Sequence, residues 1–593
     1  MDFDKKTIAA FVLIGLILIF IQTDFYQRHL VPGTKQDKEL VPDSPIRPDT
    51  PDAVDQRSVV SSREQGLSEG TLRAGTGEVT EVRGSGDSVV VETNLYRAVF
   101  STQGASLQSW MLKEYFLVDG RQVELVGEPG LGNFAALIPT HDDTLDTGPL
   151  VFNASRKRIS LNEKHPVDSV EFVLVLDGAR ELRKTYTFFH DRYDIRLLLE
   201  LRNLDNLLEG YSYALGWRSG LRATEPDLDQ DMSKAFAYAY QGDVEQYDAG
   251  SKFDPKEWDH PTDWVAIRTK YFVLAVLPES AKAQGVKFYS EKKNLGQGNK
   301  EPWKKYGFDL QMPLENKPSI ADNFTIYLGP LSYDLLTSYE AKLEDMMDLG
   351  GSIFRPFGKF ILWCFVGLRK FIPNYGFVIV VFSILIKIVL YPLTKKSYQS
   401  MKEMQTLQPL MQEINEKHKN DPQKKQQEIM SLYKEHGINP LGGCLPMLLQ
   451  LPLLYALFQV FQSTIQLRQA EFIWWIKDLS RPDTVAHLPF SIPLYGDTLN
   501  ILPLFMGVTM FIQQKMSIKD PKQKAMVYIM PVFFTLLFNS FPSGLNLYYA
   551  LFNVFSIAQE KLIPYHPKKP EELKQSKVQK KRIKHDYRGR YYK

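Results

Sequence analysis

One lysine of this chain lies inside an otherwise apolar segment. Lys387 stands in the run from Phe377 to Tyr391, whose other members are mostly Val, Ile, Leu and Phe, and Pro392 follows that run. Placing an ammonium group at the centre of a membrane helix costs roughly 2.5 to 3.5 kcal/mol, so such a group normally faces water or a partner. We therefore predict that Lys387 belongs to a functional site that attracts acidic or polar groups.

A second interpretation of Lys387 is that its long stem carries the charge to the nearer membrane surface. Thr394 marks that surface and is seven residues away. At 1.5 Å per residue the separation is about 10 Å, somewhat more than a lysine side chain covers. The functional interpretation is preferred, and the other one stays open.

Other reactive residue types give little support for catalysis. The glycines between Gly350 and Lys359 do not have the spacing of a phosphate-binding loop, and no predicted strand precedes them. Ser543 lies in a turn, but no apolar segment offers a histidine that could act as its base. The only cysteines, Cys364 and Cys444, give neither a metal-ligand pattern nor a disulfide framework. We expect no enzyme, no cofactor and no metal.

The elements that must position Lys387 are apolar helices. The chain has 593 residues and is 44% hydrophobic, with apolarity concentrated near its start and in its last 240 or so residues. Residues 1–26 read as an uncleaved signal anchor, because lysines precede the apolar stretch and no cleavage site follows it. Five further spans are predicted over Tyr375–Leu393, Leu441–Thr464, Leu499–Met516, Ala525–Phe541 and Leu545–Ile563.

Lysine-rich loops orient these spans. The 394–440 loop carries eight lysines against six acids, and the 515–524 loop carries four lysines against one acid. By the positive-inside rule, both loops and both termini face the cytoplasm. The 394–440 loop contains two segments of good helix formers and is predicted to be a helical hairpin. The tail over 564–593 has a net charge of 11 − 3 = +8 and could bind anionic lipid or ribosomal RNA.

Residues 27–374, between the first predicted span and the other five, are less apolar than the spans. Residues 27–87 are rich in Pro, Gly and Ser and are predicted to be a disordered tether. Residues 88–349 contain many short β-type segments without long helical patterns, which favours a large β-sandwich, closed by a helix over 333–349. Residues 350–374 combine aromatics with cations and are predicted to lie along the membrane surface, with a spanning helix as the alternative.

A series of short motifs, taken in order, resembles the YidC/Oxa/Alb family of membrane protein insertases. The motifs are Tyr391-Pro-Leu-Thr-Lys395, Leu407-Gln-Pro409, Asn439-Pro-Leu-Gly-Gly-Cys444-Leu-Pro446, Gln450-Leu-Pro452, Leu467-Arg-Gln-Ala470, Trp475-Ile-Lys-Asp-Leu479, Gly507-Val-Thr-Met510 and Phe541-Pro-Ser-Gly-Leu545. The anchor and the β region resemble the Gram-negative branch of that family. The resemblance implies an α-helical polytopic membrane domain with a five-helix core over 375–563, plus a periplasmic β-supersandwich, in the bacterial inner membrane.

In that family the core helices enclose a hydrophilic groove with a positive residue on the first core helix. The matching residue here is Lys387, where many bacterial members carry arginine. By the same resemblance Ser383, Gln450, Gln514 and Tyr549 are candidates for the groove or for helix interfaces. An alternative for such polar side chains is a plain hydrogen bond between helices.

The resemblance also implies a function and partners. The chain is expected to insert nascent integral membrane proteins and help them fold, alone or beside the Sec translocon, with the hairpin and the basic tail contacting the ribosome. The alternative is a solute transporter that uses Lys387 as a counter-charge. Transporters usually show internal repeats, and this sequence shows none.

Overall fold

The computed structural model describes residues 86–562 apart from short gaps, together with the isolated pairs 73–74 and 77–78. The gaps are 131, 142, 178, 205–207, 250–254, 294–302, 315–316, 350–353, 420, 437–444, 493–494 and 518–523. The anchor over 1–26, most of the tether over 27–87 and the tail over 564–593 lie outside the described residues. The chain divides into two compact units. The β unit holds the described chain up to Leu331 and Tyr339–Met346, and the helical unit holds Ser332–Ser338 and the chain from Met347 on.

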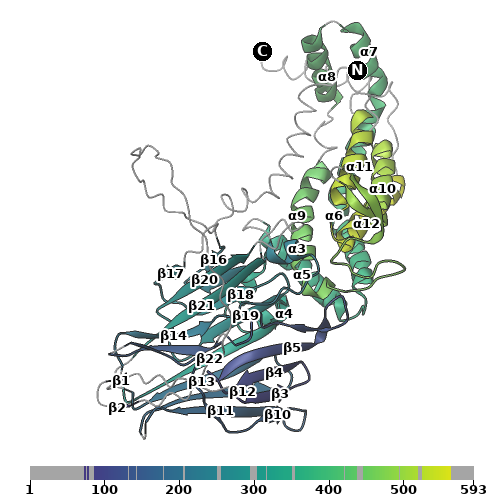
Figure 1. The fold of residues 1–593 in the computed structure, drawn as a ribbon. Helices are drawn as coiled ribbons and strands as arrows, with labels where there is room; N and C mark the ends of the chain where they lie inside the picture. Colours follow the sequence, from purple (N-terminus) through teal and green to yellow (C-terminus); the bar gives the residue numbers. More distant parts are fainter. Residues whose placement is uncertain are drawn as a thin grey trace, which may run out of the picture. The chain divides into compact units, whose positions relative to one another are not determined.

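Three sheets make up most of the β unit (Figure 1). The nine-stranded sheet runs β16 (Val244–Tyr247), β15 (Phe236–Tyr240), β18 (Trp264–Arg268), β19 (Phe272–Pro278), β22 (Ser319–Pro330), β13 (Asp194–Arg202), β12 (Glu181–Phe189), β11 (Val167–Val175), β9 (Asn153–Ala154). The six-stranded sheet runs β17 (Lys256–Trp258), β20 (Gly285–Lys293), β21 (Trp303–Pro313), β14 (Ser212–Trp217), β7 (Ala135–Pro139), β8 (Thr144–Asp146). The five-stranded sheet runs β10 (Arg158–Ser160), β3 (Ser88–Glu92), β4 (Tyr96–Ser101), β5 (Ser106–Phe116), β6 (Gln122–Glu124). Two smaller pieces complete the strand-rich region, the pair β1 (Arg73–Ala74) and β2 (Gly77–Glu78) and the helix α3 (Leu228–Met232).

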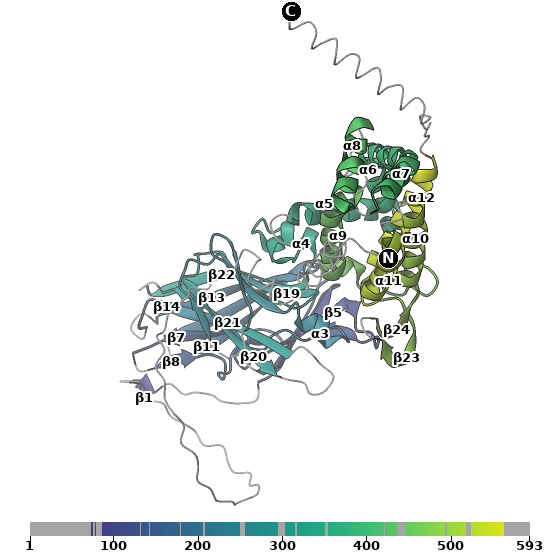
Figure 2. The same ribbon diagram turned by 90° about the horizontal axis from the view of Figure 1, so that it is seen from above.

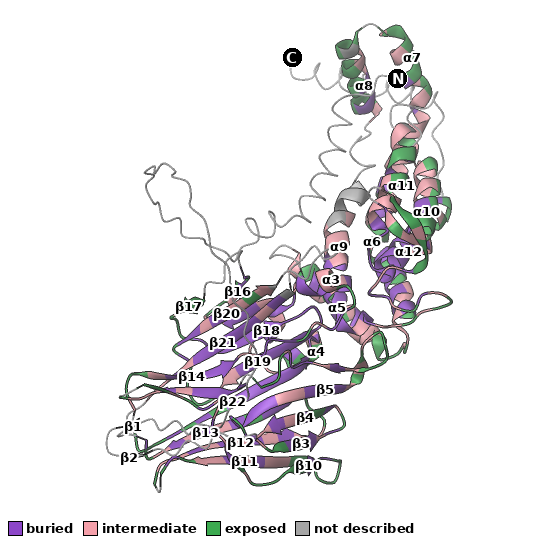
Figure 3. Ribbon diagram, in the orientation of Figure 1, coloured by how far each residue is buried: buried purple, intermediate pink, exposed green. Residues whose placement is uncertain are grey.

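Side chains cross between these sheets and form the core. Tyr186 of β12 donates a hydrogen bond to the carbonyl of Ala105, next to β5, and Tyr213 of β14 donates one to Asp322 of β22. Buried positions dominate the central strands β18, β19 and β22 (Figure 3). Continuous apolar strands of this kind need cover on both faces. The prediction of a strand-rich domain in this part of the chain is confirmed.

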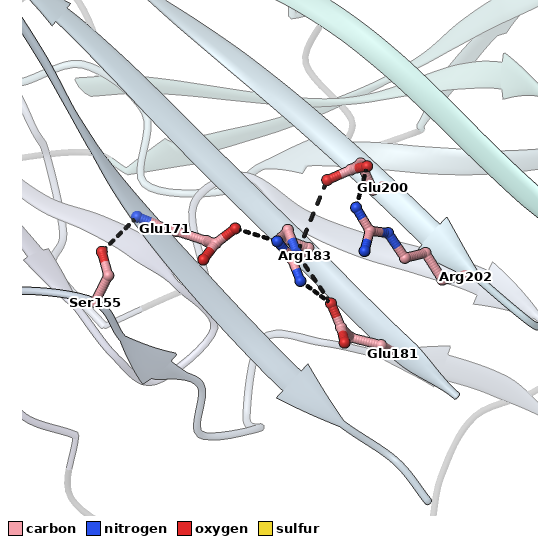
Figure 4. Close-up of polar contacts among 6 residues, drawn as sticks. All are labelled: Ser155, Glu171, Glu181, Arg183, Glu200 and Arg202. Carbon is pink, nitrogen blue, oxygen red and sulfur yellow. Dashed lines mark hydrogen bonds and ion pairs between the residues drawn. The ribbon is translucent and has the colours of Figure 1, made fainter. Parts of the chain in front are cut away.

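The outer surface of β11, β12 and β13 carries charges that pair with one another (Figure 4). Arg183 lies within ion-pair distance of Glu171, Glu181 and Glu200, and Arg202 pairs with Glu200. Opposite charges on neighbouring strands stabilise a sheet only modestly when they are partly exposed, and the Arg183 side chain is 24% exposed. This arrangement is typical of a solvated sheet face and not of a binding site.

The single helix predicted over 333–349 is wrong. The structure has a short helix α4 (Tyr333–Thr337) and a separate 3-10 turn η1 (Leu343–Met346). Between them Glu340 and Lys342 adopt positive φ angles of 53° and 59°. A left-handed backbone conformation cannot continue a right-handed helix, so the apolar spacing alone was misleading.

The helical unit contains eight longer helices among the described residues (Figure 1). They are α5 (Arg355–Arg369), α6 (Tyr375–Thr406), α7 (Gln408–Lys417), α8 (Pro422–His436), α9 (Leu445–Ser463), α10 (Ile501–Ser517), α11 (Lys524–Phe538) and α12 (Ser543–Leu562). After α9 come a short turn η3 (Ile465–Leu467) and an unpredicted hairpin of β23 (Thr484–Ile492) and β24 (Gly496–Asn500). By length and composition, one described helix, α6, could cross a membrane, and residues Ala525–Phe538 form a shorter apolar helix.

The helix α6 is longer than predicted. It passes through Pro392 and ends at Thr406, whereas the sequence placed the end of the span at Leu393 and the start of the hairpin at 394. A proline removes one backbone hydrogen bond, and the following Lys, Gln, Met and Glu residues favour a helix strongly enough to continue it. The residues Leu407, Met411, Ile429, Leu432 and Tyr433 then pack α7 against α8 in a small core of their own.

Local contacts fix where α6 begins. The side chain of Asn374 accepts hydrogen bonds from the backbone nitrogens of Gly376 and Phe377, at 2.8 and 3.3 Å. This is a standard N-cap, and it satisfies two donors that the first helical turn leaves free. Gly376 also allows the ring of Phe472 to pack closely, since an added Cβ atom would lie 1.9 Å from that ring.

Candidate functional site

A cavity of about 220 Å³ lies among α6, α9, α10, α11 and α12, and we call it the central cavity. Figure 2 shows α10, α11 and α12 together, and α12 also packs against α6. Four of the five predicted site residues line the central cavity, namely Lys387, Gln450, Gln514 and Tyr549. The fifth, Ser383, is fully buried in α6, where its hydroxyl donates a hydrogen bond to the carbonyl of Ile379 at 2.7 Å.

The ammonium group of Lys387 has two neighbours on α12. It donates a hydrogen bond to the hydroxyl of Ser556, and its nitrogen lies 3.3 Å from the centre of the Phe552 ring. The residue is 9% exposed. Within the part of the chain that the structure describes, no carboxylate lies within 4 Å of this ammonium. The charge is therefore held by neutral groups only.

The wall of the central cavity has two chemically different faces. Four residues of α11 recur at every fourth position and form an apolar stripe, Met526, Met530, Phe534 and Phe538. Residues four apart lie on one face of a helix, one turn above another. Lys387, Tyr549, Asn553 and Ser556 come from α6 and α12 and supply a polar face. The Oε1 atom of Gln514 is buried and accepts no hydrogen bond from the described residues.

Hydrogen bonds tie α12 to its neighbours around the central cavity. Asn553 donates to the carbonyl of Met506 on α10 at 3.4 Å, and Gln559 donates to Thr394 on α6 at 2.7 Å. Glu560 accepts a hydrogen bond from Ser517, the last residue of α10, at 2.7 Å. The helix that carries the neighbours of Lys387 is thus fixed on two sides.

A second polar cluster joins the start of α10 to the end of α11. Asn500 donates to the backbone and side-chain oxygens of Asn539, and Asn539 donates to the carbonyls of Tyr495 and Thr498. Asp483 is 4% exposed, and its carboxylate accepts hydrogen bonds from the first two backbone nitrogens of α10. Burial raises the pKa of this carboxyl above its usual range. The cluster holds the two helices together at this end.

Sequence reasoning did not predict Phe552, Ser556 and Glu560 as site residues. The available signal was spacing, because Tyr549, Phe552, Ser556 and Glu560 recur every three or four residues and share one face of α12. What the spacing could not show is that this face meets Lys387. Among the described residues, no group of His, Cys, Asp or Glu side chains is arranged to hold a metal ion.

Comparisons with known proteins cover both units. The family described as "60Kd inner membrane protein" matches residues 367–570, and the family described as "YidC periplasmic domain" matches residues 88–364. The membrane protein insertase YidC of Chlorobaculum parvum is 39% identical over 493 residues, which are 81% of this chain and 82% of that protein. The YidC of Chlorobium limicola is 36% identical over 572 residues, 94% of each chain.

Among solved structures, the chain is similar to an active YidC insertase whose first transmembrane domain is resolved. The identity is 19%, the match covers 82% of this chain and 96% of that one, and the TM-score is 0.35. The extent and identity of the sequence matches establish the family. The chain belongs to the YidC family of membrane protein insertases, inner membrane proteins that carry a periplasmic domain and are not enzymes.

Proposed function

We propose that the central cavity is the groove through which this insertase helps polar segments of its clients into the membrane. The observation that carries the proposal is the position of Lys387, whose charge is enclosed at the cavity wall with neutral partners only. A membrane-embedded charge of this kind marks a wet or ligand-binding path. In this proposal the central cavity is hydrated, and the Ser556 hydroxyl and the Phe552 ring favour the charged form of Lys387.

The two faces of the central cavity suit the two parts of a client. The polar segment that must cross the membrane enters from the cytoplasmic side and meets Lys387, Gln450, Gln514 and Tyr549. The apolar helix of the client follows the stripe on α11 and the helix α9, which also lines the central cavity, into lipid. Burying apolar surface releases about 25 cal/mol per Å², so a helix of about twenty residues enters the bilayer without ATP.

The proposed topology has six spans. They are the anchor over 1–26 and five core helices within 375–563, namely α6, α9, α10, α11 and α12, with both termini in the cytoplasm. The helix α5 lies along the membrane surface within 350–374, and the region 88–349 forms a periplasmic sandwich. Alternating hydropathy and the lysine-rich loops support this arrangement.

The proposed partners follow from the family and from the charge of the hairpin and the tail. Nascent integral membrane proteins are the clients, and the chain inserts them either alone or beside the Sec translocon. The hairpin of α7 and α8 and the basic tail over 564–593 contact the ribosome, and the tail also binds anionic lipid. These partners are proposals that rest on charge and on the family.

Insertion by proteoliposomes tests the role of Lys387. The purified protein is reconstituted, and a single-span client is added during its synthesis. We expect Lys387→Arg to insert the client at a rate close to the wild type, because the charge is kept, and Lys387→Glu and Lys387→Ala to be impaired. Equal insertion by all three variants would remove Lys387 from the mechanism.

Photo-crosslinking to a stalled client tests the location of the groove. A crosslinker at position 450, 514 or 549, on the cavity wall, should capture the client. A crosslinker at position 383 provides a matched control, since Ser383 lies one turn from Lys387 on the same helix but does not line the central cavity. Capture from 383 alone would place the client path one turn away along α6, outside the central cavity.

A further inference from the structure

The contacts of Lys387 with α12 form a defined arrangement. Phe552 and Ser556 are four residues apart, so their side chains lie one above the other on a single face of the helix. The nitrogen of Lys387 lies 3.3 Å from the centre of the Phe552 ring and also donates to the Ser556 hydroxyl. We call Phe552 and Ser556 the lysine seat.

The hydroxyl of Ser556 is oriented by its own helix. It donates its proton to the carbonyl of Phe552 at 2.7 Å. A hydroxyl has one proton and two lone pairs, so the lone pairs of Ser556 remain for the ammonium. The negative face of the Phe552 ring attracts the same cation. Both members of the seat therefore stabilise a positive charge, and neither one carries a charge.

Neutral partners leave the charge of Lys387 available to a third group. An aspartate or glutamate in the same place would form a closed ion pair and would cancel the field in the cavity. Among the described residues that line the central cavity, the polar ones besides Lys387 carry amide or hydroxyl groups. An ammonium has three donors, and the seat uses one of them for a hydrogen bond.

We infer that Phe552 and Ser556 are positioning residues that hold the ammonium of Lys387 in the central cavity without neutralising it, so that the cavity favours client segments with carboxylates. The inference rests on the proposed function of the cavity, in which Lys387 attracts acidic or polar client segments, and it adds the two residues that hold the charge in place. A carboxylate of the client pairs with the donors of Lys387 that the seat leaves unused, and the pair separates when the client moves on.

The test compares two clients in proteoliposomes made with the full chain. Both have the same apolar helix, and their translocated tails are either acidic or neutral. The measured quantity is the ratio of the two insertion rates. For Ser556→Asp we expect a ratio near one, because the new carboxylate pairs with Lys387. For Phe552→Leu we expect the ratio to fall roughly fivefold, the equivalent of a cation–π contact of about 1 kcal/mol.

Two further variants separate positioning from simple packing. Phe552→Tyr keeps an aromatic ring and should restore the wild-type ratio. Phe555→Leu removes a ring from the same helix that does not line the central cavity, and it should leave the ratio as it is. Wild-type ratios in both Phe552→Leu and Ser556→Asp would overturn the inference. Insertion that does not depend on Lys387 for either client would instead overturn the proposed function.

Discussion

Among the described residues, the β unit buries Lys184, Lys270 and Lys304, and the helical unit buries Lys387. The most deeply buried of the three, Lys184, differs from Lys387 in its partners. Lys184, on β12 of the β unit, has no exposed surface, and it donates to the carbonyls of Gly104 and Phe134 at 2.7 and 2.8 Å. Its nitrogen also lies 5.2 Å from the centre of the Phe152 ring. Lys387 is 9% exposed, has a single hydrogen-bond acceptor and borders a cavity.

We propose that this difference separates a structural lysine, Lys184, from a functional one, Lys387. The donors of Lys184 are directed at the backbone carbonyls of Gly104 and Phe134, which lie just before β5 and β7, so its hydrogen bonds join β12 to the other two sheets. Lys387 has donors to spare and space beside them. Burial alone does not identify a functional charge, and the informative quantity is how many of its donors the fold leaves unused.

The largest effect is expected when Lys387 is replaced by methionine. We expect insertion to fall at least roughly tenfold, because a charge-assisted hydrogen bond contributes about 1.5 to 3 kcal/mol. The thermal stability of the helical unit should stay the same or rise, since a buried charge is removed. The measurements are the initial insertion rate in proteoliposomes and thermal unfolding. Full activity in this variant would make Lys387 as structural as Lys184.

The converse change, Lys184→Met, should affect stability and leave insertion intact. The carbonyls of Gly104 and Phe134 lose their donor, which costs about 1 to 3 kcal/mol. Hydrogen exchange of the amides in β12 reports the local free energy of unfolding. A variant that keeps protected amides in β12 but loses insertion would assign Lys184 a role in the activity.

Burial of Lys184 should also make the stability of the β unit depend on pH. Burial lowers the pKa of Lys184 from 10.5 to about 7. Between these values the unfolded chain binds a proton that the folded β unit does not, so stability rises with pH across that window, by at most about 1.4 kcal/mol per pH unit. Below pH 7 this contribution is constant. Hydrogen exchange of β12, corrected for its own pH dependence, should show this slope in the wild type and lose it in Lys184→Met.

The smallest effect comes from two conservative changes of methionine. Met312 is fully buried in β21, whereas Met530 belongs to the apolar stripe of the cavity. Met312→Leu should cost less than about 1.5 kcal/mol of stability and change nothing else. Met530→Leu should leave stability unchanged but alter the relative insertion rates of different clients by roughly twofold, because the more rigid side chain adapts less well. Identical client profiles would show that the stripe does not contact clients.

Much of this arrangement could be predicted from the sequence. Apolar runs located α9, α10, α11, α12 and the start of α6 to within a few residues, because hydropathy is a local property. They did not locate the end of α6, which lies at Thr406 and not at Leu393. The position of Lys387 in such a run was sufficient to select it as a candidate. The insertase function, which rested on the motif series, is confirmed by the relatives.

The rest depended on information that is not local. Ser556 is 169 residues from Lys387, so only the packing of α12 on α6 could show that they meet. Ser383 is a polar residue one turn from Lys387, so it was a reasonable candidate for the groove. Its hydroxyl, however, donates to the carbonyl of Ile379 on its own helix. The positive φ angles of Glu340 and Lys342 divided a segment whose apolar spacing favoured one helix.

The hydrogen bonds between Asn500 and Asn539 have a mechanical consequence. They join the first turn of α10 to the last turn of α11, while the stripe and Gln514 lie farther along the same two helices. Two helices that are joined at one end can move apart only at the other end. If clients enter the central cavity as proposed, α10 and α11 separate at the end away from the two asparagines, which act as the hinge.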